Sequence, residues 1–397
     1  MAFEAQSILV LLHDLALGGS ERIAIRLANR WAEEGRKVTL FCGAREGALA
    51  NLPNAAVTIV ECAPVIRRGP GSRARLGRSL CDFLAEHDFD MIFVPGNYQW
   101  PALLQLRGSA AKRRPTIVTH VSTPLVRRGR KGLAQWVYSW ITRQRLRCVD
   151  AAIALSPKTV DHADKILGRR ITIDLPLPVL DQPQARHELA PAAGKTILAA
   201  GRLVREKGFD CAIRALALMQ DRTAKLVILG EGPLRRELED LAQRLGVAGR
   251  VSMPGYVADI RPWLNRARLF ALSSHYEGFG AVIVEALGAG RPVLSTNCTP
   301  AVDDILKPLP SCHIVPVDDA AAMAVHLDQM LREPVPDPRS LAAAVAAYNL
   351  DHVAKRHLTF FDNVHVRRLL TADQAPHFMP HIEQQRFSRE PELLGVN

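Results

Sequence analysis

Residues 273–290 read SSHYEGFGAVIVEALGAG, and they follow the apolar, strand-like segment Leu269–Leu272. The glycines of this stretch let the backbone approach a ligand closely, and the helix predicted over Gly280–Ala289 offers free N–H groups to an anion. Glu277 lies in the loop, and Glu285 lies more than one turn into the helix. Two carboxylates beside a phosphate-binding helix start suit the hydroxyl groups of a ribose and of a sugar ring. The stretch therefore predicts a strand, a ligand-binding loop and a helix in succession.

Short apolar segments alternate with helix-length amphipathic segments through most of the chain, which is typical of parallel sheets with crossover helices. In the first half the predicted strands are Ser7–Leu12, Lys37–Cys42, Val57–Val60, Met91–Val94, Thr116–His120 and Ala151–Leu155. In the second half they are Thr196–Ala200, Leu226–Leu229, Val251–Met253, Leu269–Leu272 and Pro292–Ser295. The polar run Asp181–Pro191 reads as a linker. We therefore predict two doubly wound α/β domains in series, with a cleft between them.

Two further strand ends in the second half carry residues suited to phosphate binding. Arg202 and Lys207 leave one strand end five residues apart, and they can converge on a diphosphate. The run Gly230-Glu231-Gly232 follows the next strand and precedes a helix. By themselves these signals are open to two simpler interpretations, namely two solvated surface cations and a glycine-rich turn without a ligand.

The first half has two comparable signals. Gly18-Gly19-Ser20-Glu21 follows the first strand and opens a helix, and His120 ends the strand Thr116–His120. Taken alone, the glycine run is a capped turn, and a lone His is more often structural than functional.

In combination, three motifs resemble those of the family 4 retaining glycosyltransferases of group 1, which have the GT-B fold: Gly201-Arg202…Lys207-Gly208, Gly230-Glu231-Gly232 and Glu277-Gly278-Phe279-Gly280…Glu285. The resemblance implies two Rossmann-like doubly wound domains that face each other across a cleft. It implies an acceptor-binding domain at residues 1–180 and a nucleotide-sugar-binding domain at 181–374, for which a C-terminal crossover helix is one option. Residues 375–397 are predicted to be a polar tail.

The resemblance also implies roles for single residues. Arg202 and Lys207 would hold the donor diphosphate and stabilise the leaving group, and Glu285 would bind the ribose hydroxyls. Glu277 would contact the hydroxyls of the donor sugar near the anomeric carbon, and His120 would orient the sugar or the acceptor. The implied catalytic residues are thus Glu277, His120, Arg202 and Lys207. Further donor contacts are implied for Gly19, Gly230, Glu231, Gly278, Phe279 and Gly280, and acceptor-side positions for Gly18, Gly19 and His120.

The function that follows is transfer of a sugar, with retention, from a UDP- or GDP-sugar to a lipid-linked or cell-surface glycan. Polysaccharide, lipopolysaccharide and glycolipid biosynthesis are the processes that use such transfers. The resemblance implies no cofactor and no metal; Asp88 and Asp90 match a D-x-D metal pattern, but we interpret them as turn acids before a strand. Two alternatives remain, a nucleotide-sugar 2-epimerase-like enzyme on the same fold and a catalytically silent membrane-bound partner protein.

The positive charge of the chain is confined to its first half. Residues 1–180 hold 26 Lys and Arg against 15 Asp and Glu, whereas residues 181–397 hold 25 of each. Much of the excess lies in Arg67–Arg78 and around the apolar stripe Leu133, Trp136, Val137, Trp140 and Ile141, which is flanked by Arg127, Arg128, Arg130, Lys131, Arg143, Arg145 and Arg147. This pattern suits an interfacial helix on an anionic membrane or an acceptor with a lipid diphosphate, and a crossover helix packed on the sheet is the alternative. We expect no nucleic-acid partner, because no binding module is present and aromatic content is 6%.

Composition limits the remaining classes. The seven Cys are scattered without a C-x-x-C pair, which fits reduced thiols and no structural zinc. Glu4 stands where a signal peptide would be basic, and no stretch approaches the roughly 20 apolar residues of a spanning helix. We therefore expect a cytoplasmic protein, peripherally associated with the inner face of the membrane. The chain has Thr296–Ile305 where relatives carry a glycine-rich loop, so the resemblance transfers no sugar contacts to that segment.

Overall fold

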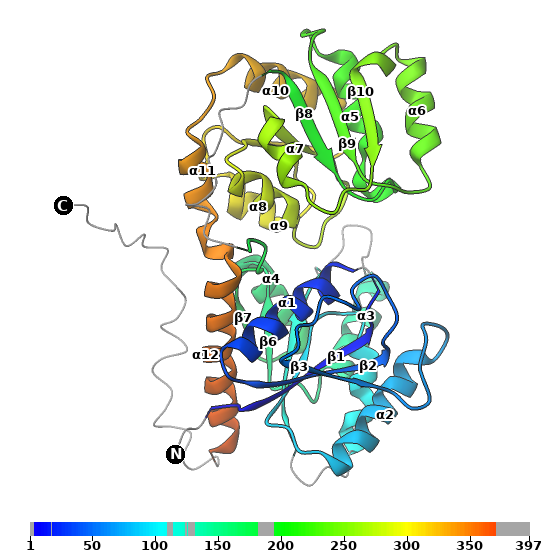
Figure 1. Cartoon of the computed structure of the whole chain (residues 1–397), viewed down its shortest axis with the longest axis vertical. Helices are drawn as coiled ribbons and strands as arrows, with labels where there is room; N and C mark the ends of the chain where they lie inside the picture. Colours follow the sequence, from blue (N-terminus) through cyan, green and yellow to red (C-terminus); the bar gives the residue numbers. More distant parts are fainter. Residues whose placement is uncertain are drawn as a thin grey trace, which may run out of the picture.

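The computed structural model describes residues 4–16, 18–108, 114–123, 125, 132–181 and 194–370. It contains two parallel β-sheets, and the two domains built on them lie one above the other along the long axis of the molecule (Figure 1). The predicted class, α/β with two doubly wound domains, is confirmed. The predicted tail, most of the predicted linker and the basic residues Arg127, Arg128, Arg130 and Lys131 lie outside the described residues.

The first sheet has the strand order β3-β2-β1-β4-β5-β6-β7, and all neighbouring pairs are parallel. Its strands are β1 (Ser7–Asp14), β2 (Lys37–Ala44), β3 (Val57–Glu61), β4 (Met91–Val94), β5 (Thr116–Val121), β6 (Ala151–Ala154) and β7 (Thr172–Asp174). The central strands are continuous apolar runs because helices cover both faces of the sheet. Along β1, Ile8 and Val10 enter one core while Leu9 and Leu11 enter the other.

The second sheet has the order β10-β9-β8-β11-β12-β13 and is also parallel. Its strands are β8 (Thr196–Ala200), β9 (Lys225–Leu229), β10 (Val251–Gly255), β11 (Leu269–Leu272), β12 (Val293–Thr296) and β13 (His313–Val315). The sequence predicts every one of these except β13, and it also misses β7. Both missed strands are three residues long and lie at a sheet edge, where an apolar run gives little signal.

The connections between strands are helices, with a few 3₁₀ turns. The helices are α1 (Gly19–Glu33), α2 (Ser72–Glu86), α3 (Gly132–Arg145), α4 (Pro157–Leu167), α5 (Phe209–Leu218), α6 (Arg235–Arg244), α7 (Arg261–Arg266), α8 (Ala281–Gly288), α9 (Pro300–Leu306), α10 (Ala320–Arg332), α11 (Pro338–Ala344) and α12 (Leu350–Leu369). The 3₁₀ turns are η1 (Trp100–Gly108), η3 (Arg205–Lys207), η4 (Ala248–Arg250) and η5 (Ala346–Tyr348).

Strand order reverses beside the first strand of each domain, between β1 and β4 in one sheet and between β8 and β11 in the other. In open α/β sheets, ligands bind outside the carboxyl ends of the strands at such switch points. The loops after β1, β4, β8 and β11 are therefore the places where the fold positions a site.

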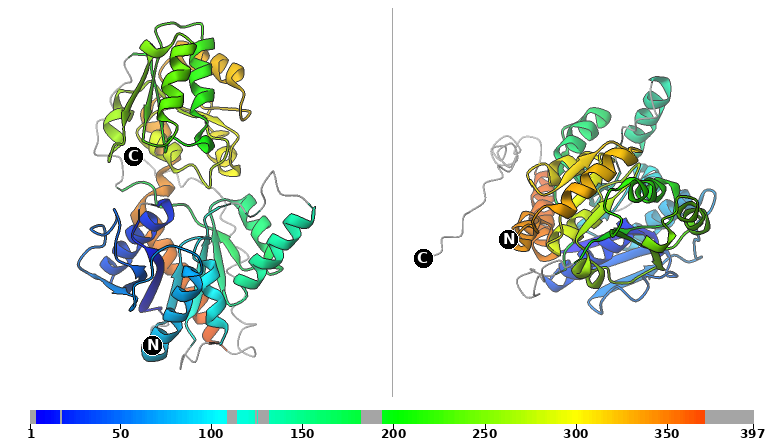
Figure 2. Two further views of the ribbon diagram at one scale, coloured as in Figure 1. Left: turned by 90° about the vertical axis from the view of Figure 1, so that its right-hand side faces the viewer. Right: turned by 90° about the horizontal axis from the view of Figure 1, so that it is seen from above.

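The last helix returns to the first domain. The chain crosses between the domains twice, and the two crossings pair through a parallel bridge between Leu180 and Asn349. From there α12 runs along the first domain, as Figure 2 also shows, and its Phe361 is fully buried with its ring 5.1 Å from that of Trp31. The core of the first domain is thus completed by residues from the far end of the sequence.

Candidate active site at the junction of the two domains

The candidate site begins at the loop after β8, which packs against the end of β11. The turn η3 ends at Gly208, whose φ is 58°, and a Cβ there would lie 2.2 Å from the carbonyl oxygen of Ser273. Only glycine permits this contact. Two hydrogen bonds connect the loop after β8 with the loop after β11. Ser273 Oγ donates to the carbonyl of Lys207, and the His275 N–H donates to the carbonyl of Glu206, both at 2.9 Å. The two loops therefore form one unit.

Within this unit, the predicted residues Lys207 and Glu277 form an ion pair, with 2.6 Å between Nζ and Oε1. The hydroxyl of Ser274 donates to the same carboxylate oxygen at 2.7 Å. Ser274 is fully buried, and its carbonyl accepts a hydrogen bond from Thr296 Oγ1 at 2.5 Å. The Lys207 and Glu277 side chains are 22% and 13% exposed, so a ligand can reach both. The sequence analysis missed Ser274, although it lies in the strand-end segment that carries Glu277.

Gly278 brings the Glu277 loop against the first domain. A Cβ on Gly278 would lie 2.7 Å from the carbonyl oxygen of Ser122, which follows β5. A larger residue would therefore force one domain away from the other. Two residues further on, Gly280 precedes α8. The Ile283 N–H donates to the carbonyl of Gly280 at 2.9 Å, whereas the N–H groups of Ala281 and Val282 have no acceptor among the described residues.

Glu285 lies on α8 close to the first domain. Burial raises the pKa of its carboxyl group, and the positive charges of Arg22 and Arg26 on α1 act in the opposite direction. Among the described residues, no side chain donates a hydrogen bond to this carboxylate. It is therefore available to the hydroxyl groups of a ligand at the junction.

The other predicted donor contacts lie around this centre. Arg202 is exposed beyond the end of β8 and has no acidic partner in the described part of the chain. Gly230 lies at the end of β9, and its N–H donates to the end of β10 at 2.8 Å. Glu231 is engaged by Arg235, and this hydrogen-bonded ion pair lowers the pKa of Glu231. The ring of Phe279 is buried in the second domain's core, so its side chain faces away from a ligand.

Gly18 and Gly19 open α1, as predicted. The following residue, Ser20, lies close to the loop after β4: a Cβ on Gly96 would be 3.2 Å from Ser20 Oγ and 2.9 Å from Ser122 Oγ. The glycine run is thus on the first domain's side of the junction, beside the segment that Gly278 touches.

Asn97 is a junction residue that the sequence analysis missed. Its Oδ1 accepts a hydrogen bond from the Ser122 N–H, and its Nδ2 donates to Thr123 Oγ1, both at 2.9 Å. Asn97 therefore fixes the segment after β5 that receives Gly278. The Pro95-Gly96-Asn97 turn after the buried strand β4 was the available signal.

His120 does not lie where the resemblance implies. Its ring is buried in the first domain, with Nε2 3.0 Å from Nε2 of His357 on α12 and its centroid 4.8 Å from that of Phe93. The reason is strand alternation: His120 and Val118 point to the face of β5 that α1 and α12 cover. His120 therefore holds α12 to the sheet and does not contact a sugar or an acceptor.

The predicted apolar stripe lies on α3, which stands out from the first domain (Figure 2). Leu133, Trp136, Val137 and Trp140, here called the α3 stripe, are 75%, 63%, 40% and 54% exposed. For these four residues the alternative of packing on the sheet is therefore wrong, whereas Ile141, the fifth residue of the predicted stripe, is half-buried. Over the described residues, no helix has the length and apolar content needed to cross a bilayer.

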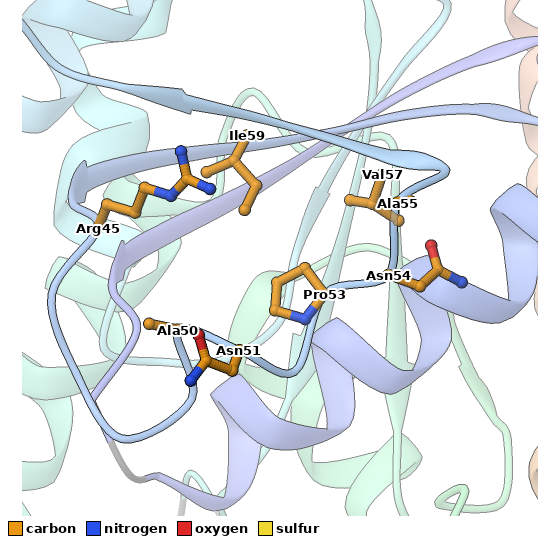
Figure 3. A pocket seen from close by; sticks show the side chains of 8 residues that line it. All are labelled: Arg45, Ala50, Asn51, Pro53, Asn54, Ala55, Val57 and Ile59. Carbon is orange, nitrogen blue, oxygen red and sulfur yellow. The ribbon is translucent and has the colours of Figure 1, made fainter.

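Asp90 of the D-x-D pattern lies just before β4, at the opposite end of that strand from the loop that carries Asn97. The carboxylate of Asp90 accepts hydrogen bonds from the N–H and the hydroxyl of Ser7, which is a structural role at the sheet edge. Searching the described residues finds no group of three His, Cys, Asp or Glu arranged to hold a metal ion. A hollow of about 400 Å³ lies at the opposite edge of the first sheet, where Arg45, Asn51 and Asn54 surround it (Figure 3). It belongs to the β2–β3 connection and not to the loops described above.

Both halves of the chain match known families. One model, described as glycosyl transferases group 1, matches residues 194–333, and another, described as glycosyltransferase family 4, matches residues 17–173. The lipopolysaccharide core biosynthesis glycosyltransferase LpsE of Rhizobium meliloti is 40% identical over 107 residues, which are 27% of this chain and 31% of LpsE. The phosphatidyl-myo-inositol mannosyltransferase of Mycobacterium tuberculosis is 28% identical over 367 residues, which are 87% of this chain and 93% of that protein.

The matches with the first curated relatives span between 27% and 59% of those proteins' lengths. Among solved structures, HepE of Anabaena in complex with UDP and glucose has a TM-score of 0.66 and 19% sequence identity, with coverage of 92% of this chain and 99% of HepE. This likeness shows the GT-B fold. Because both domains match glycosyltransferase models and the motif residues assemble where those domains meet, the chain belongs to the group 1, family 4 glycosyltransferases.

Proposed function

We propose that this protein transfers a sugar, with retention of anomeric configuration, from a nucleoside diphosphate sugar to a lipid-linked or cell-surface glycan. The observation that carries the proposal is the Lys207–Glu277 pair, supported by Ser274 and set beside the first turn of α8. A cation, a carboxylate and free helix amides together match the diphosphate and the hydroxyl groups of such a donor.

In the proposed reaction, the donor diphosphate replaces Glu277 as the partner of Lys207. Arg202 and the N–H groups at the start of α8 stabilise the negative charge that develops on the leaving diphosphate. Released from Lys207, the carboxylate of Glu277 accepts hydrogen bonds from the sugar hydroxyls, while Ser274 keeps it in place. These protein cations supply the charge stabilisation that a metal ion provides in other transferases, so we propose metal-independent transfer.

We propose UDP as the nucleotide. The solved HepE complex holds UDP and glucose, and that protein shares the fold of this chain over most of its length. The unpaired carboxylate of Glu285 is suited to accept hydrogen bonds from the two ribose hydroxyls of such a nucleotide.

We also propose that the acceptor is presented at an anionic membrane, on its cytoplasmic face. The α3 stripe is exposed, and Arg143 and Arg147 flank it as exposed cations. Tryptophan with basic flanks is typical of helices that lie in the interface of anionic lipids. The names of LpsE and of the mannosyltransferase, one referring to lipopolysaccharide and the other to a phosphatidylinositol, agree with a lipid-linked acceptor.

The test is a transfer assay with radiolabelled UDP-sugars, a bacterial lipid extract as acceptor and EDTA in the buffer. We expect label to enter the lipid fraction with wild-type protein and to be lost by about 100-fold or more in Glu277→Gln, which keeps the shape of the side chain but not its charge. Glu237→Gln, an exposed acid on α6, is the matched control. Formation of an epimeric sugar without transfer would favour the epimerase, and no consumption of any donor by folded protein would contradict an enzymatic role.

A further inference from the structure

Two arginines stack on Tyr98 of the first domain, and a third lies near one of them. The guanidinium carbons of Arg68 and Arg73 lie 4.9 and 5.0 Å from the centre of the Tyr98 ring, which is 36% exposed. The charge of Arg73 also acts on Arg145 at the end of α3. Arg68 and Arg73 lie five residues apart around the start of α2, whereas Arg145 comes from the end of α3.

Arg68 is held in a fixed orientation. Its Nε and Nη2 donate to the two carboxylate oxygens of Asp14, at 2.5 and 2.8 Å, and Asp14 ends β1. The neighbouring His13 is fully buried and bonds both Asp14, through Nδ1, and Ser72, through Nε2. A planar guanidinium anchored in this way on one edge presents its remaining face and donors at a defined position.

Arg73 and Arg145 have no such partner. Among the described residues, no acidic side chain forms an ion pair with either of them, and Arg145 Nε is buried without a hydrogen-bond acceptor. Burial and the positive charge of Arg73 both lower the pKa of Arg145. Like charges placed close together without a counter-ion are unfavourable, and a bound anion would relieve this.

The location connects this arginine cluster, defined by Arg68 and Arg73 on the Tyr98 ring, with the junction. Tyr98 directly follows Asn97, which holds Ser122. The carbonyl of Ser122 in turn touches Gly278, next to Glu277. The cluster therefore lies on the first domain's side of the junction, close in the structure to the loop that carries Glu277.

We propose that Arg68, Arg73 and Tyr98 form a site that binds a phosphate ester group of the acceptor. The inference rests on the proposed transferase function, because the phosphate that this site binds is part of the acceptor of that reaction. Arg68 and Arg73 donate to the phosphate oxygens, and the Tyr98 ring, which both guanidinium groups contact, positions them. The phosphate belongs either to a lipid headgroup or to a phosphorylated sugar, and both have the same recognition chemistry.

The test is isothermal titration calorimetry on the full chain, with and without saturating UDP. The probes are monomeric dihexanoylphosphatidylglycerol, which is a lipid phosphodiester, and glycerol 3-phosphate, which is a phosphate monoester without acyl chains. The variants are Arg73→Gln, Arg73→Lys and the control Arg78→Gln, which removes the same charge from an exposed position of the same helix.

We expect at least one probe to bind the wild type saturably and to bind Arg73→Gln about tenfold more weakly, because charge-assisted hydrogen bonds are lost. Arg73→Lys should recover part of the affinity, and Arg78→Gln should behave as wild type. The probe that binds more tightly identifies the source of the phosphate. Equal affinities of wild type and Arg73→Gln, or no saturable binding of either probe to the wild type, would overturn the proposal. Failure of the transferase function would show separately, as absence of UDP binding.

Discussion

At the scale of single residues, the carboxylate of Glu277 is oriented before a donor arrives, because Lys207 and Ser274 bond to the same oxygen. In the proposed reaction Lys207 binds the donor diphosphate, so Ser274 is the partner that remains on Glu277. Ser274 is thus a positioning residue, and its contribution can be separated from binding.

Ser274→Ala should lower kcat by about tenfold, because one hydrogen bond to a charged group is lost. The affinity for UDP should be unchanged, since Ser274 has no contact with the proposed phosphate-binding groups. Ser295→Ala is the matched control, because Ser295 is also fully buried and its hydroxyl bonds only to the neighbouring backbone carbonyl. A lower UDP affinity with unchanged kcat would contradict the positioning role.

The buried histidine pair makes a second residue-scale prediction. His357 Nδ1 lies 2.9 Å from the carbonyl of Val353, so Nδ1 carries the proton and Nε2 accepts from His120. Burial lowers the pKa of both rings, that of His357 to about 4. Both are therefore neutral when folded, whereas they titrate near 6.5 when unfolded.

Because the unfolded chain binds more protons below pH 6.5, the free energy of unfolding should fall as pH decreases from 6.5 to 4. The His357 shift alone accounts for about 3 kcal/mol of this loss. Chemical unfolding across this range, compared with the double variant His120→Leu and His357→Leu, measures the effect. The account requires a flatter pH dependence in the variant, and identical slopes would contradict it.

The position of His120 also shows what sequence cannot supply at this scale. The strand was predicted correctly, and alternation fixes which residues share a face. The face of β5 that His120 occupies is covered by α12, a helix more than 200 residues further along the chain. Whether His120 is a site residue or a core residue depends on this packing. Lys207 and Glu277 were predictable because their loops follow predicted strands of one sheet, whose carboxyl ends meet at one edge.

At the scale of elements, α3 differs from the other helices of the first domain. Its buried residue is Thr142, and the four large apolar residues of the α3 stripe face solvent. Amphipathic spacing predicted the stripe but not the direction in which it points, since packing on a sheet and lying on a membrane need the same spacing. In the same way, the longer buried strands were predictable from apolar runs, whereas β7 and β13 were too short.

The exposed stripe predicts binding to anionic vesicles. Trp136→Ser combined with Trp140→Ser should weaken binding to phosphatidylcholine–phosphatidylglycerol vesicles by about tenfold or more, because two aromatic side chains no longer enter the interface. Cosedimentation measures this directly. In the wild type, vesicles should also shift tryptophan fluorescence to the blue, since Trp136 and Trp140 are exposed while Trp31 and Trp100 are buried.

Leu218→Ser is the matched control, because Leu218 is 58% exposed but lies on the second domain. Its vesicle binding should equal that of the wild type. If the double Trp variant sediments with vesicles as well as the wild type does, the stripe is not the membrane-binding surface.

At the scale of the whole molecule, function depends on how closely the two domains meet. The contact between Gly278 and Ser122 leaves no space for a side chain. Gly278→Ala should therefore separate the loop that carries Glu277 from the first domain and lower kcat/KM by about tenfold to 100-fold, as small misplacements at a reacting centre do.

UDP binding, which the proposal assigns to the second domain, should persist in Gly278→Ala. Gly249→Ala serves as the control, because a Cβ at Gly249 meets no atom within 4 Å. Full activity in Gly278→Ala would show that the observed approach of the domains is not needed for transfer.

The most direct test of the central claim, that this site binds a nucleoside diphosphate sugar, is a thermal-shift measurement with UDP, GDP, ADP and their sugars, without added metal. A ligand at 100 times its dissociation constant stabilises the folded state by about 2.7 kcal/mol, which raises the unfolding midpoint clearly. The account predicts such a shift for UDP and its sugars in the wild type and a much smaller one in Lys207→Ala. No shift with any nucleotide in folded wild-type protein, or an equal shift in Lys207→Ala, would contradict it.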